Sequence, residues 1–313
     1  MKIIENDLKK WPKDSFKEAD IHYPVMYREV AEYLSIQTRK IVVDCTVGVG
    51  SHASWLIPQL PQGSLYIGID KDNDSLEMAK DRLSDFVGRF ILIKEDFRSV
   101  NSVLEQLQIE QVDAFLFDLG ISTFQLSHPE RGFSFSKEGP LDMRMDRESF
   151  LCAYDLVNNL SERELRMIFE KFGEERYSRR IAHHLVEKRR KTPLYTTRQL
   201  VEAITEVVPS KSFRYKIHPA TRVFQALRIA VNRELDCLSQ GLEVAVPYLR
   251  AGGRIVAISF HSLEDREVKH TFRHYASQNE VKVLTKKPLV PAPDEVNTNS
   301  ASRSAKLRAI EKL

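Results

Sequence analysis

The feature that most limits the fold of this chain is an alternation of strands and helices between residues 40 and 118. Four short apolar runs have the length and β-branched content of buried strands: Lys40–Cys45, Ser64–Asp70, Phe90–Lys94 and Val112–Asp118. The stretches between them have helical spacing: Ala53–Gln59, Asp72–Leu83 and Val103–Gln108. Because strands separated by helices fold as right-handed βαβ units, this part of the chain is predicted to form a parallel sheet.

The alternation stops after residue 126 and resumes near residue 225. The segment between has no convincing buried strand and three helical patterns: Ser161–Phe172, Glu174–Lys191 and Thr197–Val208. Ser161 and Glu164 form a capping box at the start of the first of these helices. We therefore predict an α/β core at 21–126 and 226–313, an inserted all-helical substrate-recognition domain at 127–225, and a flexible extension at 1–20.

The C-terminal part is predicted to return to the α/β pattern. A long helical stretch, Ala220–Leu249, is expected to break near Gly241 or Pro247. Pro288–Ser302 is rich in Pro, Asn and Ser and is expected to be a loop. The other expected elements follow a turn at 251–253: the strand Arg254–Phe260, the helix Leu263–Tyr275, and the strands Glu280–Thr285 and Ser304–Ile310.

Charge and cysteine content narrow the class of protein. The net charge is +3, and residues 127–222 hold 19 Lys and Arg against 14 Asp and Glu, so the basic surplus lies in the predicted insert. Such a surplus suits contact with RNA phosphates, although a charged helix face is usually only solvated.

Three widely spaced cysteines form neither a disulfide framework nor a C-x-x-C metal site, which favours the cytoplasm. No apolar run is long enough to span a membrane.

A glycine-bearing loop within Val42–His52 joins the first predicted strand to the first helix. Gly48 and Gly50 allow backbone torsions and close approaches that side chains would block. Asp70 ends the second strand, where a carboxylate can accept hydrogen bonds from both ribose hydroxyls of an adenosine. This spacing fits two cofactor classes, nicotinamide dinucleotides and S-adenosylmethionine.

Acidic and aromatic residues favour S-adenosylmethionine over a dinucleotide. Asp44 directly precedes the loop, where it would repel a pyrophosphate and attract a sulfonium with its ammonium group. Phe97 follows the third strand and could stack on an adenine or pack in the core, with Asp96 or a backbone group reading the adenine amino group. Asp118 ends the fourth strand and is expected to face the ligand crevice.

Long motifs extend from residue 22 to the last predicted strand. They are His22–Met26 (HYPVM), Asp44–His52 (DCTVGVGSH), Asp118–Ser122 (DLGIS) with Gln125 and Leu126, Glu130–Phe135 (ERGFSF), Gly139–Asp146 (GPLDMRMD), Gly173–Arg176 (GEER), His218–Arg228 (HPATRVFQALR) and Ser259–Arg266 (SFHSLEDR). Together they resemble the RsmH (MraW) methyltransferases, a family that methylates the N4 amine of a cytosine in bacterial 16S ribosomal RNA.

The resemblance implies a class I S-adenosylmethionine-dependent methyltransferase core, of the Rossmann-like α/β class, with a helical insertion. Ser51 stands where the family usually has a second glycine, so its torsions must be ones that a residue with a Cβ can adopt. The implied cofactor contacts are Gly50, Ser51, His52, Asp70, Phe97, Asp118 and Gln125. Gly48 of the same loop is a further candidate for contact with the cofactor.

The implied partner is 16S ribosomal RNA within the small ribosomal subunit, at a cytosine of the decoding region (P-site). No membrane and no metal is expected as a partner, and a homodimer is compatible with the sequence. An NAD-dependent oxidoreductase on a similar core and a non-catalytic RNA-binding assembly factor are the alternatives.

Two residues are candidates for a catalytic role. Asp118, or the carbonyls of residues 118–121, could accept hydrogen bonds from the target amine and favour its nucleophilic form. The acid or amide followed by two prolines that many amine methyltransferases use is absent here. His261 follows the fifth predicted strand and could contact the base, accept a proton, or serve only the structure.

Overall fold

The computed structural model describes residues 24–209 and 218–313. The expected extension at 1–20, and His22 of the first motif, lie outside the described residues. No helix in the described part is long and apolar enough to cross a membrane.

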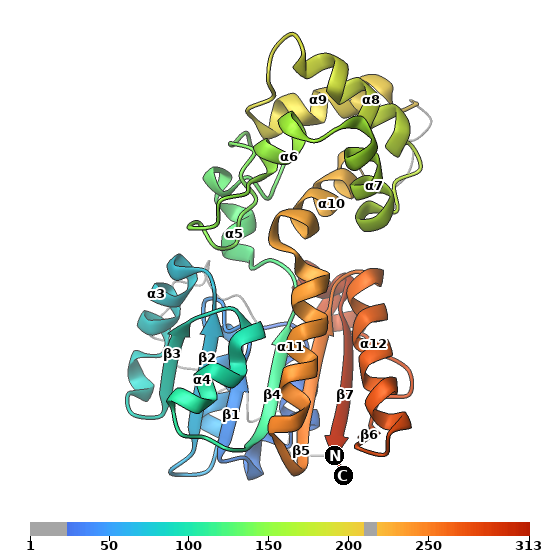
Figure 1. The fold of residues 1–313 in the computed structure, drawn as a ribbon. Helices are drawn as coiled ribbons and strands as arrows, with labels where there is room; N and C mark the ends of the chain where they lie inside the picture. Colours follow the sequence, from blue (N-terminus) through green and yellow to red (C-terminus); the bar gives the residue numbers. More distant parts are fainter. Residues whose placement is uncertain (1–23, 210–217) are drawn as a thin grey trace.

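A seven-stranded sheet with the order β3-β2-β1-β4-β5-β7-β6 forms the centre of the core (Figure 1). The first five strands pair in parallel, whereas β7 is antiparallel to both of its neighbours. This order with one reversed strand is that of class I methyltransferases, which confirms the predicted fold class. The strands are β1 (Ile41–Asp44), β2 (Leu65–Asp70), β3 (Phe90–Lys94), β4 (Val112–Asp118), β5 (Leu249–Ser259), β6 (Val281–Val283) and β7 (Lys306–Lys312).

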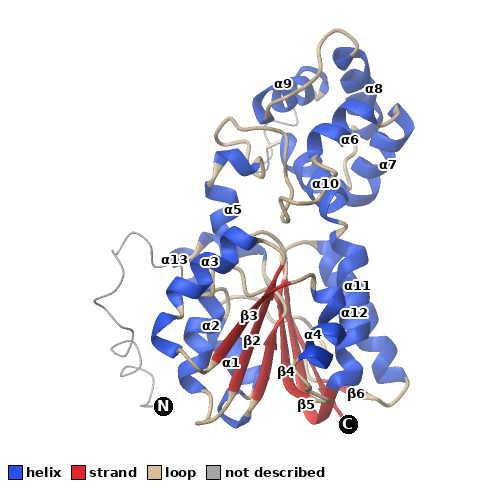
Figure 2. Cartoon of the chain, turned by 60° about the vertical axis from the view of Figure 1, so that its left-hand side comes forward, coloured by secondary structure: helices blue, strands red, loops and turns tan. Residues whose placement is uncertain are grey.

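Helices cover both faces of the sheet and bury its apolar side chains in two separate clusters (Figure 2). One face packs on α4 (Val100–Gln106), α11 (Glu234–Tyr248) and α12 (Ser262–Ser277). The other packs on α1 (Tyr27–Leu34), α2 (Ser51–Leu56) and α3 (Asn73–Arg82). Because helices cover both faces, the strands are continuous apolar runs rather than alternations of apolar and polar residues, as is typical of parallel sheets.

The helical insert lies beyond the carboxyl ends of the parallel strands and has its own hydrophobic cluster (Figure 1). That cluster includes Val231 of the last insert helix, so we propose that the insert ends at Arg233 rather than at residue 225. The capping box of Ser161 and Glu164 is present as predicted. The helices are α5 (Thr123–Ser127), α6 (Ala153–Asn159), α7 (Glu162–Gly173), α8 (Ser178–Arg189), α9 (Thr197–Val207) and α10 (Ala220–Asn232).

The long helical stretch breaks at Arg233, so the prediction of a break near Gly241 or Pro247 was wrong. Arg233 has a left-handed φ of 51° between α10 and α11, a conformation that costs energy without a glycine. Asn232 helps to hold the joint, because its side chain donates to the carbonyl of Met143 and accepts from the N–H of Met145.

Two further segments differ from the prediction. The expected turn at 251–253 lies inside β5, where the pairing with β4 shifts register and Gly252 has a φ of 73°. The expected loop Pro288–Ser302 contains helix α13 (Pro293–Thr298) and a 3₁₀ helix (Ser300–Ser304). α13 is tied to the core because Glu295 accepts a hydrogen bond from the N–H of Met26.

Candidate active site

A cavity of about 1410 Å³ opens at the carboxyl edge of the sheet, beneath the insert. Its walls come from the β1–α2 loop, the ends of β2, β4 and β5, helix α5 and the start of α11. Single small-molecule sites usually have about 300–1000 Å³, so this cavity has room for a cofactor together with a second ligand.

The glycine loop takes the conformation that its sequence predicts. Gly48 and Gly50 both have left-handed backbones, with φ values of 52° and 78°. A Cβ on Gly50 would lie 3.3 Å from Ala79 of α3, so only glycine fits without movement of that helix. Ser51 is the first residue of α2 and has no positive φ, so serine is tolerated there. Its hydroxyl accepts a hydrogen bond from Arg82 at 2.5 Å.

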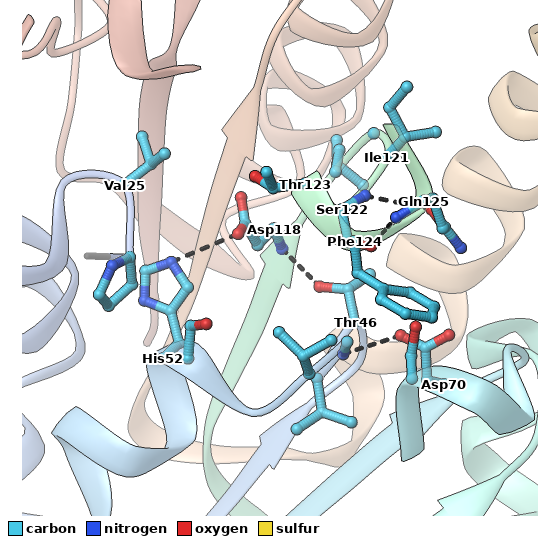
Figure 3. A pocket seen from close by; sticks show the side chains of 18 of the residues that line it. Val25, Thr46, His52, Asp70, Asp118, Ile121, Ser122, Thr123, Phe124 and Gln125 are labelled. Atoms are coloured by element: carbon cyan, nitrogen blue, oxygen red, sulfur yellow. Dashed lines mark hydrogen bonds and ion pairs between the residues drawn. The ribbon is translucent and has the colours of Figure 1, made fainter. Parts of the chain in front are cut away.

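Asp70 lies beside this loop in the position expected of a ribose-binding carboxylate (Figure 3). The backbone N–H groups of Gly48 and Asp72 donate to its two oxygens at 2.8 and 2.9 Å. These bonds fix the carboxylate while leaving lone pairs on each oxygen for hydroxyl donors. Burial raises the pKa of Asp70 to about 6, although both N–H donors act in the opposite direction.

Asp44 is directed away from the cavity, contrary to the expectation that it faces a cationic ligand. Its carboxylate is buried and accepts hydrogen bonds from the hydroxyl of Tyr66 and the N–H of Thr46. Desolvation raises its pKa to about 6. Asp44 therefore stabilises the loop from behind the cavity wall, whereas Asp118 on the adjacent strand β4 lines the cavity.

His52 and Asp118 form a pair on the cavity wall at the end of β4 (Figure 3). His52 is 5% exposed, and its Nε2 lies 3.3 Å from Oδ2 of Asp118. The backbone N–H of Asp118 donates to the hydroxyl of Thr46 at 2.7 Å, which fixes the strand end. Within residues 24–209 and 218–313, the buried Oδ1 of Asp118 has no hydrogen-bond partner. Buried polar atoms are rarely left unpaired. The Asp118 side chain is 25% exposed, and through this exposed part its carboxylate is accessible to a ligand in the cavity.

Phe97 both lines the cavity and packs in the core. Its ring meets that of Phe117 edge-on, with centroids 5.7 Å apart. A Cβ on Gly241 would come within 2.4 Å of the Phe97 ring, so the glycine of α11 makes room for it. Asp96 is committed to Arg98 and the first turn that follows, so an adenine amino group would have to be read by another group.

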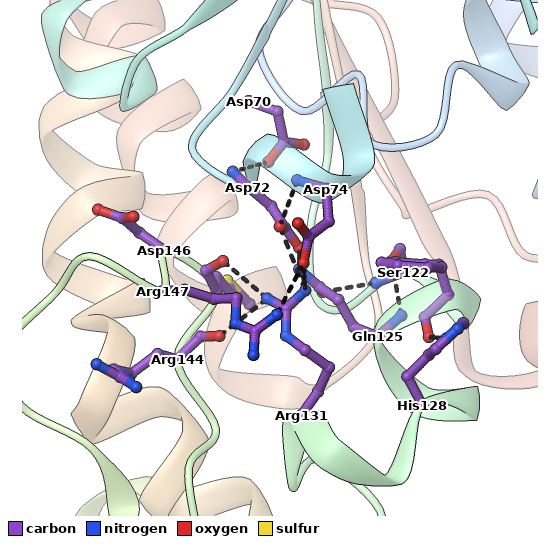
Figure 4. Close-up of polar contacts among 12 residues, drawn as sticks. Asp70, Asp72, Asp74, Ser122, Gln125, His128, Arg131, Arg144, Asp146 and Arg147 are labelled. Atoms are coloured by element: carbon purple, nitrogen blue, oxygen red, sulfur yellow. Dashed lines mark hydrogen bonds and ion pairs between the residues drawn. The ribbon is translucent and has the colours of Figure 1, made fainter. Parts of the chain in front are cut away.

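Gln125 closes the cavity on the side of α5 and is held at both ends of its amide (Figure 4). Its Nε2 donates to Asp72 at 2.7 Å, and its Oε1 accepts from the N–H of Ser122. Asp72 also pairs with Arg131 of the insert at 2.9 Å, and both side chains are almost completely buried. The sequence reading missed Asp72 and did not assign Arg131 this structural contact.

His261 is not among the described residues that line the cavity. Its Nδ1 accepts from the N–H of Glu264 and so caps α12, and its Nε2 lies 3.1 Å from Oε1 of the same glutamate. Nδ1 is thus engaged in the helix cap, Nε2 is directed at Glu264 without forming a hydrogen bond, and the side chain does not line the cavity, which leaves the proposed proton-accepting role of His261 without geometric support. Glu264 lines the cavity instead, together with Arg228 and Glu234, none of which the sequence reading singled out.

A family model described as the MraW methylase family matches residues 19–313. The chain belongs to the MraW methylase family. Two curated proteins named "Ribosomal RNA small subunit methyltransferase H" are similar over almost their whole length. The one from Thermotoga neapolitana is 51% identical, with 94% of this chain and 97% of the relative covered. The one from Persephonella marina is 46% identical, with 93% and 99% covered.

Solved structures give only a distant likeness to this MraW methylase. An rRNA methylase from Streptococcus thermophilus is 13% identical, with a TM-score of 0.42 over 92% of this chain and 93% of that one. A TM-score this low supports no argument about the fold, which is assigned from the strand order instead. Membership in a methylase family confirms the prediction of S-adenosylmethionine as the cofactor, where the spacing of the loop and Asp70 alone also allowed a nicotinamide dinucleotide.

The affinity of this MraW methylase for S-adenosylhomocysteine is expected to fall as the pH drops through 6. Protonation of Asp70, whose pKa is raised to about 6, removes acceptors for the ribose hydroxyls. Affinity should be constant above about pH 7 and approach a tenfold loss per pH unit well below 6. Calorimetric titrations across this range test the prediction.

The matched control is Asp70→Asn, which should bind weakly with a nearly flat pH profile. Asp44 has a similarly raised pKa but lies behind the cavity wall. A pH dependence that persists in Asp70→Asn would assign the effect to Asp44 and contradict the prediction.

Proposed function

We propose that this chain transfers a methyl group from S-adenosylmethionine to the N4 amine of a P-site cytosine in 16S ribosomal RNA, within the small ribosomal subunit. The names of the curated relatives support the ribosomal substrate. The observation that carries the chemistry is the partly exposed carboxylate of Asp118, one oxygen of which lacks a hydrogen-bond partner among the described residues, on the wall of a cavity large enough for two ligands.

Asp118 would act on the target amine rather than on the methyl donor. The cofactor supplies an activated methyl group, and the protein supplies orientation and electrostatics. An exocyclic amine is a poor nucleophile while its lone pair is delocalised into the base. A hydrogen bond from N4–H to the carboxylate of Asp118 would favour the form in which this lone pair is free to attack. The carboxylate would take the proton released after the new N–C bond forms, with Nε2 of His52 3.3 Å from its Oδ2.

A base inside folded RNA must be turned out of its helix to reach this depth. The position of the insert over the cavity suits it to hold the surrounding RNA. RNA phosphates would be the main electrostatic contacts of the insert, so the basic residues in and just before α8 are the candidates for binding them.

Only part of the basic surplus of the insert is free to bind phosphate. Lys188 and Arg190 are paired with Glu206 and Glu187, and Arg189 donates to backbone carbonyls. Three arginines at the other end of α8 are exposed and have no acidic partner among the described residues: Arg176, Arg179 and Arg180. The run at 188–191 is therefore mostly a solvated, paired helix face.

Replacing Arg176, Arg179 and Arg180 together by alanine is expected to weaken RNA binding about tenfold or more near physiological salt. Each lost phosphate contact should lower the slope of log affinity against log salt by about 0.7–0.9. Filter binding to unmodified small subunits at several salt concentrations measures both effects. The control is Lys188→Ala with Arg190→Ala, which removes two positive charges instead of three and should change the slope little. Equal losses per charge removed in the two variants would show a general charge effect instead.

The proposed function is tested by mass mapping of 16S ribosomal RNA from cells that lack the chain, with and without complementation. The expected result is the loss of one methyl group from a decoding-region cytosine and its return on complementation. Purified chain with S-adenosylmethionine should restore it on unmodified subunits. Binding of NADH but not S-adenosylhomocysteine would favour an oxidoreductase, and subunit binding without methyl transfer would favour an assembly factor.

A further inference from the structure

The cavity extends past Asp118 to the end of β5, where it is lined by charged groups that the cofactor positions do not use. Arg228 of α10, Glu234 of α11 and Glu264 of α12 meet there. The expected cofactor contacts follow β1, β2, β3 and β4 or lie in α5, so the region at the end of β5 is the part left for the acceptor base. It also lies at the junction of insert and core, where a base turned out of the RNA would enter.

Arg228 is held rigidly in this region. Its Nε and Nη2 donate to the two carboxylate oxygens of Glu234, each at 2.8 Å, and both side chains are mostly buried. Nη2 is also 3.8 Å from Glu264. Glu264 is fixed in turn, because it accepts from the N–H of Phe260 at 2.8 Å and contacts His261. A forked pair of this kind sets the plane of the guanidinium as well as its position.

One end of this guanidinium is not used by the protein. Arginine has five N–H donors, and the pair with Glu234 employs only Nε and one proton of Nη2. Within residues 24–209 and 218–313 the hydrogen bonds of the Arg228 side chain use Nε and Nη2 and not Nη1, and the side chain lines the cavity. Arg228 is therefore a preorganised cationic donor with an unused end, and it lines the same cavity as Asp118.

We infer that Arg228 reads the acceptor edge of the target pyrimidine and selects cytosine over uracil. This inference rests on the proposed N4 methylation. With the N4 amine at Asp118, the neighbouring N3 and O2 atoms are the acceptors that Nη1 of Arg228 would meet. N3 of uracil carries a hydrogen, so the same donor would oppose it. Asp118 pairs with Ile258 at the ends of β4 and β5. Glu264, 3.8 Å from Arg228, accepts from the N–H of Phe260 just after β5. Both sides of the base-reading site therefore lie next to these strand ends.

Phe260 would form the side of this site next to the base. It follows β5 and lines the cavity, and a Cβ on Gly120 would lie 3.5 Å from its ring. Gly120 thus leaves the ring accessible between the ends of β4 and β5. A flat apolar surface there suits a pyrimidine held by polar contacts at its edge.

The test compares two RNA substrates that differ by one atom of the base. Small-subunit RNA is ligated around a synthetic segment that carries either cytidine or 3-deazacytidine at the target position, and is assembled into subunits. 3-Deazacytidine keeps the N4 amine but lacks the N3 acceptor. Methyl transfer is measured at saturating S-adenosylmethionine for the wild type, Arg228→Met and Arg228→Lys.

The wild type should methylate the cytidine substrate at least about tenfold faster than the 3-deazacytidine substrate. In Arg228→Met both rates should be low and nearly equal, because the donor that distinguishes the two bases is gone. Arg228→Lys keeps the charge but not the fork, so it should recover part of the discrimination. S-Adenosylhomocysteine affinity reports whether each variant is folded.

Three results would overturn the inference. A wild-type preference near one would show that N3 is not read, whatever the variants do. A tenfold preference that persists in Arg228→Met would limit Arg228 to holding the joint between α10 and α11. Failure of the wild type to methylate the cytidine substrate would instead reject the proposed function, and the inference with it.

Discussion

Replacing Asp118 by asparagine is expected to lower methyl transfer at saturating cofactor and substrate about 10²- to 10³-fold. The amide keeps the shape of the side chain but offers one acceptor oxygen without charge and cannot take the released proton. Its backbone bond to Thr46 is unaffected, so the strand end should stay in place. Single-turnover transfer of labelled methyl groups to unmodified subunits measures the chemical step.

The binding of S-adenosylhomocysteine to the same variant separates two roles of Asp118. Affinity within about tenfold of wild type, with the rate loss above, supports contact with the target amine. If the rate at saturating cofactor is unchanged and only affinity falls, Asp118 is a cofactor-binding residue and the proposed mechanism is wrong. Asp44→Asn is a useful comparison, because that carboxylate lies behind the wall and should affect stability more than turnover.

The second large effect is expected from Arg131→Met, which should destabilise the protein by about 3–5 kcal/mol. The change leaves the buried carboxylate of Asp72 without its main cationic partner. It also removes the hydrogen bonds that Arg131 donates to the carbonyls of Arg144 and Met145. Denaturant unfolding measures the loss, and S-adenosylhomocysteine affinity should fall as well, because Asp72 also holds Gln125.

Arg147→Ala is the matched control for this prediction. Arg147 belongs to the same segment and contacts Asp74, 3.3 Å away, but its side chain is 56% exposed. Exposed pairs contribute about 0–1 kcal/mol, so this variant should be nearly as stable as the wild type. Similar losses in the two variants would mean that burial of the Arg131 pair is not what stabilises the contact between insert and core.

The strands could be predicted because each is a buried run bounded by turns. β3 and β4 begin and end at the residues expected from the sequence. The break at Arg233 could not be predicted, since Gly241 carries the stronger local signal. Tertiary contacts decide the outcome: Gly241 stays helical against Phe97, while Asn232 bonds to the loop before α6. α13 was missed for a similar reason, because its anchor is a distant N–H at Met26.

The same distinction, between positions set by the local sequence and positions set by tertiary contacts, applies to the residues of the candidate site. Residues at strand ends, such as Asp70 and Asp118, converge because parallel strands end on one edge. His261 also follows a strand end in the sequence, but its side chain caps helix α12 by accepting a hydrogen bond from the N–H of Glu264. Arg228 could not be singled out from the sequence, because its proposed role depends on the break between α10 and α11, which no local pattern predicts.

The separate hydrophobic cluster of the insert has a consequence for how this family can change. None of its buried members, Phe133 to Val231, belongs to the clusters that hold the sheet together. Substitutions inside the insert that keep the pair of Arg131 with Asp72 therefore need not be matched by changes around the methyl donor. Descendants of such a protein could acquire a new target while inheriting the old chemistry intact, and exchange of whole insertions that keep this pair should yield folded hybrids.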